Sequence, residues 1–304
     1  MELRCFLDGH PTGFIGTSTI VGSCNGLLCV QTRVFHTLPP TLYILNPAIR
    51  EVMQVPRIRT TSDVVGYSFG FGFSPSVNDY KIVIIYMGAL VGHNVMIGRV
   101  AVCSLTTKSW KDIEFGIVKG RSFCSQSLNV DGSIFWLARN VLIFEGWKFI
   151  ALALVSFDLA LEEFKVIPTP LSRGEGVAKL AVYEKRLALL HSSFAPNSVI
   201  DLWVIEEGIG ASWSKMFTFG PYPYHLRPLT ICRSQIVGTI FYTGKFQFME
   251  EEGEKKEKKD DIFFINLTSN EFKVIADRRY GRSGCSFEYV ESLLSPSNIE
   301  LRKP

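Results

Sequence analysis

Three stretches of the chain share one pattern: Val100–Phe115 (VAVCSLTTKSWKDIEF), Leu154–Pro168 (LVSFDLALEEFKVIP) and Ile262–Ala276 (IFFINLTSNEFKVIA). In each, an apolar run leads to a leucine, and an aromatic residue follows that leucine by five positions, with polar residues between them. Apolar runs rich in β-branched and aromatic residues, separated by a short polar turn, are typical of β-hairpins. These stretches therefore predict three hairpins of one repeated design.

Two further stretches are looser copies of the same hairpin. They are Leu42–Pro56, with Asn46-Pro47 at its turn, and Ile200–Phe219, which has a longer turn. The aromatic slot of the five copies is taken at Met53, Trp110, Phe164, Trp213 and Phe272, so that successive slots lie 57, 54, 49 and 59 residues apart. A period near fifty residues indicates a propeller or a solenoid. The regular place of the slots indicates that their side chains belong to the core between repeats.

Before each hairpin the sequence shows another pair of short apolar strands. In the first and third repeats this pair is joined by Asn25-Gly26 and Asp131-Gly132, and such dipeptides favour two-residue hairpin turns. The chain is therefore expected to be all-β, a β-propeller of four-stranded antiparallel blades with five recognisable units. A remaining strand candidate, Ser286–Leu294, either begins a partial sixth blade made from the chain ends or closes the ring against the N-terminus.

The longer connections are expected to gather on one face. In an up-and-down blade the second-to-third and fourth-to-first connections leave on the same side, and here they are longer than the others. The expected loops are residues 31–41, 57–65, 87–98, 115–123, 138–149, 168–177, 192–200, 219–228, 244–260 and 276–284. Loops on a rigid scaffold concentrate binding residues, and aromatic and arginine side chains are enriched at binding hot spots. The candidate partner-binding residues are His36, Arg57, Arg59, His93, Trp147, Tyr222, Tyr224, His225, Arg278 and Arg279.

Charge and composition argue against several classes of partner. The 304 residues carry 32 basic and 29 acidic side chains, a net charge of +3 without a basic block, so no nucleic-acid partner is expected. The longest apolar run, Phe149–Val155, is far below the roughly 20 residues of a membrane helix, so no membrane partner is expected. Seven cysteines without metal or redox spacing fit buried thiols in a reducing compartment. We expect the chain in the cytoplasm, the nucleus or both.

The motifs of enzyme and cofactor sites are missing from the sequence. The five histidines are scattered, with no two at the spacing of zinc ligands. Gly70-Phe71-Gly72 lacks the third glycine of a dinucleotide fingerprint, and we interpret it as a place where a neighbour packs closely on a strand. No phosphate loop or nucleophile elbow occurs. No catalytic residue, metal ligand or cofactor is therefore expected, and only a carboxylate pair brought together by the fold is left open.

Eight strings occur in order between residues 22 and 296. They are GSCNGLLCV (Gly22–Val30), LNPAIRE (Leu45–Glu51), GFGFSPSVNDYKIV (Gly70–Val83), SLTTKSWK (Ser104–Lys111), DGSIFWLA (Asp131–Ala138), LVSFDLALEEF (Leu154–Phe164), IDLWVIEEGIGASWSKMFTF (Ile200–Phe219) and YVESLLSP (Tyr289–Pro296). In this order they resemble the F-box-associated domain of plant F-box proteins, a propeller-type family. One hairpin departs from the family pattern, because Ile49 and Val52 stand where the family often has threonine and tryptophan. The domain is expected over residues 21–296, between an N-terminal remnant at 1–20 and a C-terminal tail at 297–304.

The resemblance implies a protein-binding module rather than an enzyme. In the family this domain captures a target protein, and an F-box ahead of it docks on the Skp adaptor of a cullin ubiquitin ligase, which ubiquitinates the target. Residues 1–20 show no leucine- and proline-rich helical module, so the Skp adaptor and the cullin are expected as partners only if an F-box is supplied upstream. Two alternatives stay open: a stand-alone binding propeller that competes with full-length relatives, and a propeller enzyme.

Overall fold

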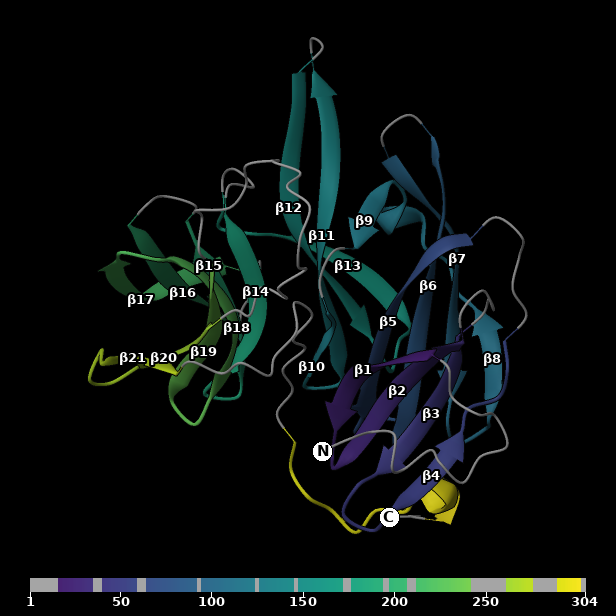
Figure 1. Ribbon diagram of the computed structural model, residues 1–304. Helices are drawn as coiled ribbons and strands as arrows, with labels where there is room; N and C mark the ends of the chain where they lie inside the picture. The colour runs from purple at the N-terminus through teal and green to yellow at the C-terminus, as the bar shows by residue number, and fades with distance from the viewer. Residues whose placement is uncertain are drawn as a thin grey trace, which may run out of the picture. The chain divides into compact units, whose positions relative to one another are not determined.

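The computed structural model describes residues 16–34, 40–58, 64–91, 94–123, 126–144, 147–171, 176–193, 197–206, 212–241, 261–275 and 289–301. Strands β1 to β21 form five antiparallel sheets (Figure 1). No helix in these ranges is long and apolar enough to cross a bilayer. The chain divides into two compact units, residues 1–169 with 287–304 and residues 170–286. The predicted all-β, propeller-type fold class with five four-stranded blades is confirmed.

The first unit holds three sheets. The first sheet contains β1 (Gly16–Cys24), β2 (Leu27–Val34), β3 (Thr41–Asn46) and β4 (Glu51–Gln54). The second contains β5 (Val64–Ser74), β6 (Asp79–Val91), β7 (Asn94–Ser104) and β8 (Ser109–Asp112). The third contains β10 (Leu128–Val130), β11 (Ser133–Phe144), β12 (Trp147–Asp158) and β13 (Glu163–Pro168), and β9 (Arg121–Phe123) also pairs with β11. A 3-10 turn, η1 (Gly116–Val118), follows the second sheet.

The second unit holds two sheets. The fourth sheet contains β14 (Val177–Tyr183), β15 (Arg186–Ser192), β16 (Ser198–Glu206) and β17 (Ser212–Tyr222). The fifth contains β18 (His225–Cys232), β19 (Gln235–Phe241), β20 (Asp261–Asn266) and β21 (Phe272–Ile275). Buried aliphatic and aromatic side chains of both sheets, among them Leu202 and Phe263, form one core cluster. The four-strand repeat predicted from the sequence therefore holds in both units.

The two predicted hairpin turns have the expected backbone geometry. Asn25 and Gly26 have φ values of 50° and 78°, and Asp131 and Gly132 have values of 45° and 74°. Two consecutive residues with positive φ define the turn whose twist matches that of antiparallel strands. The same geometry recurs between β14 and β15 and between β18 and β19, where no glycine marks it.

The aromatic slot of the first hairpin was placed one residue too far along the chain. Cross-strand pairs set Leu45 opposite Val52, just as Cys103 lies opposite Trp110. Val52, and not Met53, is therefore the equivalent position. The sequence did not reveal this register, because the residue at the slot, Val52, is aliphatic and gives no aromatic signal.

Of the other four slots, Phe164 is buried and the other three are half-buried. Phe164 lies in the core shared by the second and third sheets, as expected. Trp110 packs against the core of the first two sheets and donates its indole N–H to the Pro56 carbonyl, 2.8 Å away. Phe272 stacks on Phe263 with ring centroids 5.8 Å apart. Trp213 is half-buried at the start of β17.

The glycines of β5 allow two sheets to approach closely. A Cβ atom added at Gly70 would lie 2.5 Å from the Trp136 ring of the third sheet, and one at Gly72 would lie 2.3 Å from the Asn129 side-chain oxygen. Trp136 is fully buried and donates its indole N–H to the Phe69 carbonyl at 2.9 Å. The prediction that a neighbour packs on these glycines is therefore confirmed, and the partner is a tryptophan 66 positions along the chain.

A buried ion pair also joins the second and third sheets. The Lys81 ammonium lies 2.7 Å from a Glu162 carboxylate oxygen and 2.5 Å from the Leu159 carbonyl, and Lys111 pairs with the other oxygen of Glu162. The side chains of Lys81 and Glu162 are 7% and 12% exposed. Glu162 lies in the turn before β13 with φ 59°, in the left-handed region. In this position its carboxylate reaches Lys81 of β6.

The C-terminal segment does not begin a sixth blade. Residues 289–294 of the proposed Ser286–Leu294 strand form no strand, and the short 3-10 helix η3 (Pro296–Leu301) follows. Instead, the Asn46 side-chain amide donates to the carbonyls of Ser292 and Leu294, each at 2.8 Å. The segment therefore crosses the end of the first sheet and satisfies a buried asparagine there, which a strand at the sheet edge would not do.

Candidate recognition face

Two hairpins of the first unit project beyond their blades at the same end (Figure 1). β6 and β7 pair as far as Val91 opposite Asn94, and β11 and β12 pair as far as Phe144 opposite Trp147. The sequence had predicted loops at 87–98 and 138–149, and both predictions were wrong over the described residues, which continue as strands. Long apolar runs on both sides of a tight turn prolong a hairpin, and Val141–Phe144 with Trp147–Val155 is such a pair of runs.

The β11–β12 ribbon is the longer of the two projections. We define it as Arg139–Phe144 paired with Trp147–Leu152. The outer strand β13 pairs with β12 only from Ala153 onward, and β9 reaches no further along β11 than Asn140. Beyond those points the ribbon is two-stranded within the described residues.

Strand alternation divides the ribbon positions between two faces. The cross-strand pairs Leu142–Phe149 and Phe144–Trp147 fall on the face that continues from the buried Ile134 and Trp136. The pairs Val141–Ile150 and Ile143–Lys148 fall on the other face. Both faces are thus rich in large apolar residue types. This composition is unusual for a two-stranded projection, which normally carries charge or proline to prevent association.

The predicted contact residues are placed as follows. His36, Arg59, His93, Arg278 and Arg279 lie outside the described residues. Arg57 follows β4 and is exposed, and Trp147 begins β12 opposite Phe144 in the ribbon. Of the five that the structure describes, only Trp147 belongs to a feature that projects from its blade.

Tyr222, Tyr224 and His225 lie in the second unit around the turn between β17 and β18, and all three are half-buried. The rings of Tyr222 and Tyr224 stack on Phe272, with centroids 4.5 and 5.9 Å away. The Tyr222 hydroxyl donates to the Asn270 side chain at 3.1 Å, and burial raises its pKa. These contacts give both tyrosines a structural role at the edge of the core, beside any role in contacting a partner.

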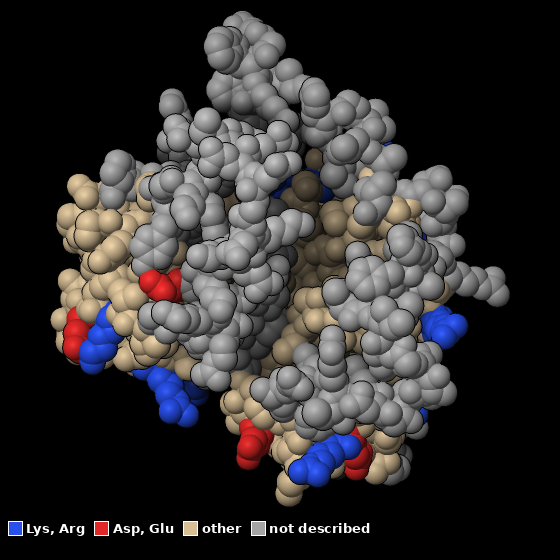
Figure 2. All heavy atoms as spheres, viewed as in Figure 1, with Lys and Arg blue, Asp and Glu red and all other residues tan. Residues whose placement is uncertain are grey.

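Charged side chains are interspersed on the described surface that Figure 2 shows, where lysine and arginine alternate with aspartate and glutamate. No group of three or more histidine, cysteine, aspartate or glutamate side chains among the described residues could hold a metal ion. Burial raises the pKa of the Cys24 thiol to about 11 and that of Cys103 to about 12. Thiols held in the neutral form are poor nucleophiles. Of the four described cysteines, Cys29 and Cys103 are buried as expected, Cys24 is half-buried, and Cys232 is exposed at the end of β18.

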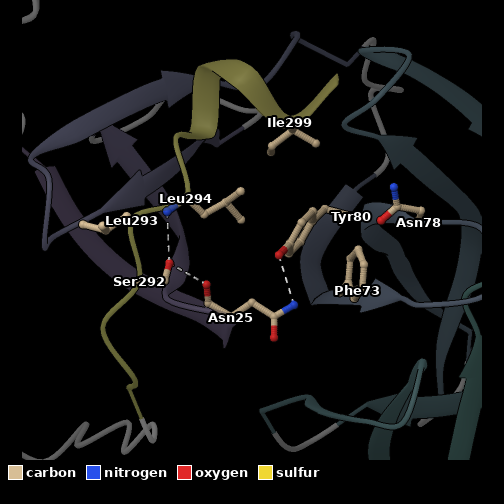
Figure 3. A pocket seen from close by; sticks show the side chains of 8 residues that line it. All are labelled: Asn25, Phe73, Asn78, Tyr80, Ser292, Leu293, Leu294 and Ile299. Carbon is tan, nitrogen blue, oxygen red and sulfur yellow. Dashed lines mark hydrogen bonds between the residues drawn. The ribbon is translucent and has the colours of Figure 1, made fainter. Parts of the chain in front are cut away.

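A cavity of about 410 Å³ lies beside the C-terminal segment (Figure 3). It is at the end of the first unit opposite the ribbon (Figure 1). The Asn25 side-chain amide donates to the Tyr80 hydroxyl at 3.0 Å, and the Ser292 hydroxyl donates to the Asn25 carbonyl at 2.9 Å. The uncharged lining is completed by apolar side chains, including those of Leu294 and Ile299 on the C-terminal segment. The polar groups of Asn25, Tyr80 and Ser292 already bond one another, so the cavity marks where the C-terminal segment closes over the first two sheets.

The comparisons with known proteins agree with this architecture. A family model described as the F-box associated beta propeller domain matches residues 8–289. The chain is 28% identical over 251 residues to the F-box/kelch-repeat protein At3g23880 of Arabidopsis thaliana, covering 79% of this chain and 64% of that one. It is 29% identical to the putative F-box protein At4g38870 of the same plant, covering 65% and 44%. It is 26% identical to F-box protein CPR1 of the same plant, covering 69% and 54%. The chain spans about half the length of these curated relatives.

Proposed function

This chain belongs to the F-box associated beta propeller domain family, and on that premise we propose that it captures target proteins for a Skp–cullin–F-box ubiquitin ligase. The observation that carries the proposal is the match over residues 8–289 together with relatives that are all named F-box proteins. The domain supplies recognition. The Skp adaptor and the cullin come into contact with it through an F-box joined upstream.

Two features of the structure support a role in binding rather than catalysis. The blades are rigidly built, with fully buried residues such as Trp136 and Phe157 at the sheet interfaces, and binding elements are positioned best on such a scaffold. The ribbon projects from that scaffold with Trp147 at its end. The described residues gather no metal-ligand cluster, and we place the chemistry of ubiquitin transfer on other subunits.

The proposal is tested by joining an F-box ahead of Met1 and expressing the fusion in plant cells beside the same F-box without this chain. We expect a defined set of proteins to gain ubiquitin on lysine in the fusion cells when the proteasome is inhibited, and to fall in abundance when it is active. Identical ubiquitin profiles in the two cell lines would refute the proposal.

A second measurement separates the ligase receptor from a stand-alone binding domain. The fusion should bind purified Skp adaptor, and the proteins it marks should also co-purify with the chain expressed without an F-box. If the same proteins are retained but the fusion marks none of them, the domain binds without coupling to the ligase. If nothing is retained in either form, the recognition role itself fails.

A further inference from the structure

The C-terminal segment, residues 289–301, is held on the first unit by side-chain contacts. Residues 289–295 belong to no strand, so no ladder of paired backbone groups fixes them. The Asn46 amide donates to the carbonyls of Ser292 and Leu294. The Ser292 hydroxyl donates to the Asn25 carbonyl (Figure 3). A segment held in this way can open locally while the sheets beneath it stay folded.

One further contact of the segment joins a hydroxyl to a carboxylate. The Ser295 hydroxyl donates to a carboxylate oxygen of Glu51, which lies opposite Asn46 at the end of the β3–β4 hairpin. Ser295 and Glu51 are both half-buried. Residues 289–301 contain two glutamates and no lysine or arginine. The charges that Glu51 and the segment bring to Ser295 are therefore negative, and Arg50, exposed in the same hairpin turn, is the base that opposes them.

The residue after Ser295 is proline, and a serine or threonine followed by proline is the motif that proline-directed kinases recognise. The chain contains three such pairs: Ser74-Pro75, Thr169-Pro170 and Ser295-Pro296. Ser74 is 1% exposed at the end of β5, so a kinase reaches it only when the second sheet unfolds. The Thr169 hydroxyl donates to a backbone carbonyl, whereas the Ser295 hydroxyl donates to a carboxylate. Of the two, Ser295 therefore places a new negative charge directly against an existing one.

We propose that Ser295 is a phosphorylation site and that its phosphate releases the C-terminal segment from the first unit. The kinase takes the segment in its locally opened form. A bond forms between the Ser295 Oγ and the γ-phosphorus of ATP, the bond from that phosphorus to the oxygen that leaves with ADP breaks, and the hydroxyl proton passes to a base of the kinase. This inference goes beyond the proposed function and does not depend on it.

The phosphate changes the contact with Glu51 in two ways. Its dianion has no proton to donate, and at pH 7 it carries a charge of about −1.5 to −2. In the closed position this charge would lie beside the Glu51 carboxylate. Like charges in contact at a half-buried position repel, so the modified segment favours its open form. The segment would then act as a two-state element that the modification biases.

The first test measures where the folded chain is modified. The full chain is incubated with ATP and, in separate reactions, a mitogen-activated kinase and a cyclin-dependent kinase, and mass spectrometry locates the phosphate. We expect phosphate on Ser295 and none on Ser74. Asn46→Ala lacks two hydrogen bonds that hold the segment, so it should be phosphorylated at Ser295 about tenfold faster or more. The absence of phosphate on Ser295 with both kinases would overturn the proposal, and so would equal rates at Ser295 and Ser74, which would indicate global unfolding.

The second test measures release by amide hydrogen exchange. Exchange at residues 293–295 should be about tenfold faster or more in the phosphorylated chain than in the unmodified chain, while exchange in β11 should be unchanged. Ser295→Ala is the matched control, because it accepts no phosphate at this position and its exchange there should be the same before and after treatment with the kinase. Slower exchange after phosphorylation would indicate that Arg50 binds the phosphate and holds the segment closed, which would overturn the proposal.

A variant of Glu51 tests the cause of release. Glu51→Gln keeps an acceptor for the Ser295 hydroxyl and offers an amide donor to a phosphate, so phosphorylation of this variant should accelerate exchange at residues 293–295 by about threefold at most. The larger effect in the wild type would then come from repulsion by the carboxylate. Equal acceleration in the wild type and in Glu51→Gln would overturn this assignment.

Discussion

The buried ion pair between the second and third sheets should respond asymmetrically to removal of its two members. Lys81, whose side chain is 7% exposed in the wild type, keeps the Leu159 carbonyl as its remaining acceptor among those described when Glu162 is replaced by alanine. An uncompensated buried charge costs about 3 kcal/mol or more. Lys81→Met should cost only about 1 kcal/mol, because Glu162 keeps Lys111 and the methionine side chain fills a similar space.

Thermal unfolding of the full chain at pH 7, followed by calorimetry or circular dichroism, measures the difference. For a unit of this size about 3 kcal/mol lowers the melting temperature by about 6–12 °C. Lys108→Ala is the matched control, because Lys108 occupies the equivalent turn position at φ 52° and is exposed. Lys108→Ala makes the same backbone substitution at a positive-φ position but removes no buried charge. Equal melting temperatures for Glu162→Ala and Lys108→Ala, or a larger loss for Lys81→Met than for Glu162→Ala, would refute the reasoning.

The pH dependence of the same variants has a defined sign. Burial by itself raises the pKa of Glu162, but hydrogen bonds from Lys111 and Lys81, with their charges, outweigh it and leave the pKa below its ordinary value. A carboxyl whose pKa is lower in the folded state stabilises the fold above its unfolded pKa of about 4.3, and this contribution is lost as the pH falls through the folded pKa. The gap in melting temperature between the wild type and Glu162→Ala should therefore narrow below about pH 4.3, and a gap that widens there would contradict the assignment.

Three further predictions follow from single contacts. Gly70→Ala should destabilise the chain by about 1–3 kcal/mol, because its methyl group would lie 2.5 Å from a buried indole. A methyl group at Gly98 meets no heavy atom within 4 Å, so Gly98→Ala should leave the melting temperature unchanged. An equal loss of stability in both variants would exclude the close approach at Gly70 as the cause. Asn46→Ala removes the two hydrogen bonds that its amide donates to the C-terminal segment, so amide exchange at residues 292–295 should accelerate, and unaltered protection would show that the remaining contacts, among them those of Ser292 with Asn25 and of Ser295 with Glu51, hold the segment without it. A thiol reagent should modify Cys232 in the folded chain well before Cys103, whose pKa burial raises to about 12; a Cys232→Ser variant should lose one fast-reacting thiol relative to the wild type, and an unchanged number of fast-reacting thiols would contradict the assignment.

The strand repeat could be predicted because its signals are local. The polar residue just before each leucine shows how local they are: the Asp158 carboxylate accepts the backbone N–H groups of Ala160 and Leu161, and the Asn266 side chain does the same for Thr268 and Ser269. Such side-chain turns are encoded within a few residues. The sequence therefore located the aromatic slots of these hairpins. In the first hairpin it placed the slot one residue too far, at Met53, because Val52 is not aromatic.

Other features depend on contacts that no local pattern reveals. Glu184-Lys185 and Arg233-Ser234 adopt positive φ at both turn positions although neither pair contains glycine or asparagine, because the paired strands on either side impose the turn. Trp136 fits over Gly70, and Lys81 reaches Glu162, only after the second and third sheets have packed. The ribbon was missed for a related reason: residues 138–149 were assigned to a loop, whereas cross-strand pairs continue as far as Phe144 opposite Trp147.

The base and the projecting part of the β11–β12 hairpin are held by different contacts. Ile134 and Trp136 are buried at the base of β11, so replacing them creates cavities and lowers stability. The described ribbon strands, Val141–Phe144 and Trp147–Ile150, pair only with each other among the described strands. The projecting part therefore depends on the pairing of its own two strands, whereas its base depends on the packing between the second and third sheets.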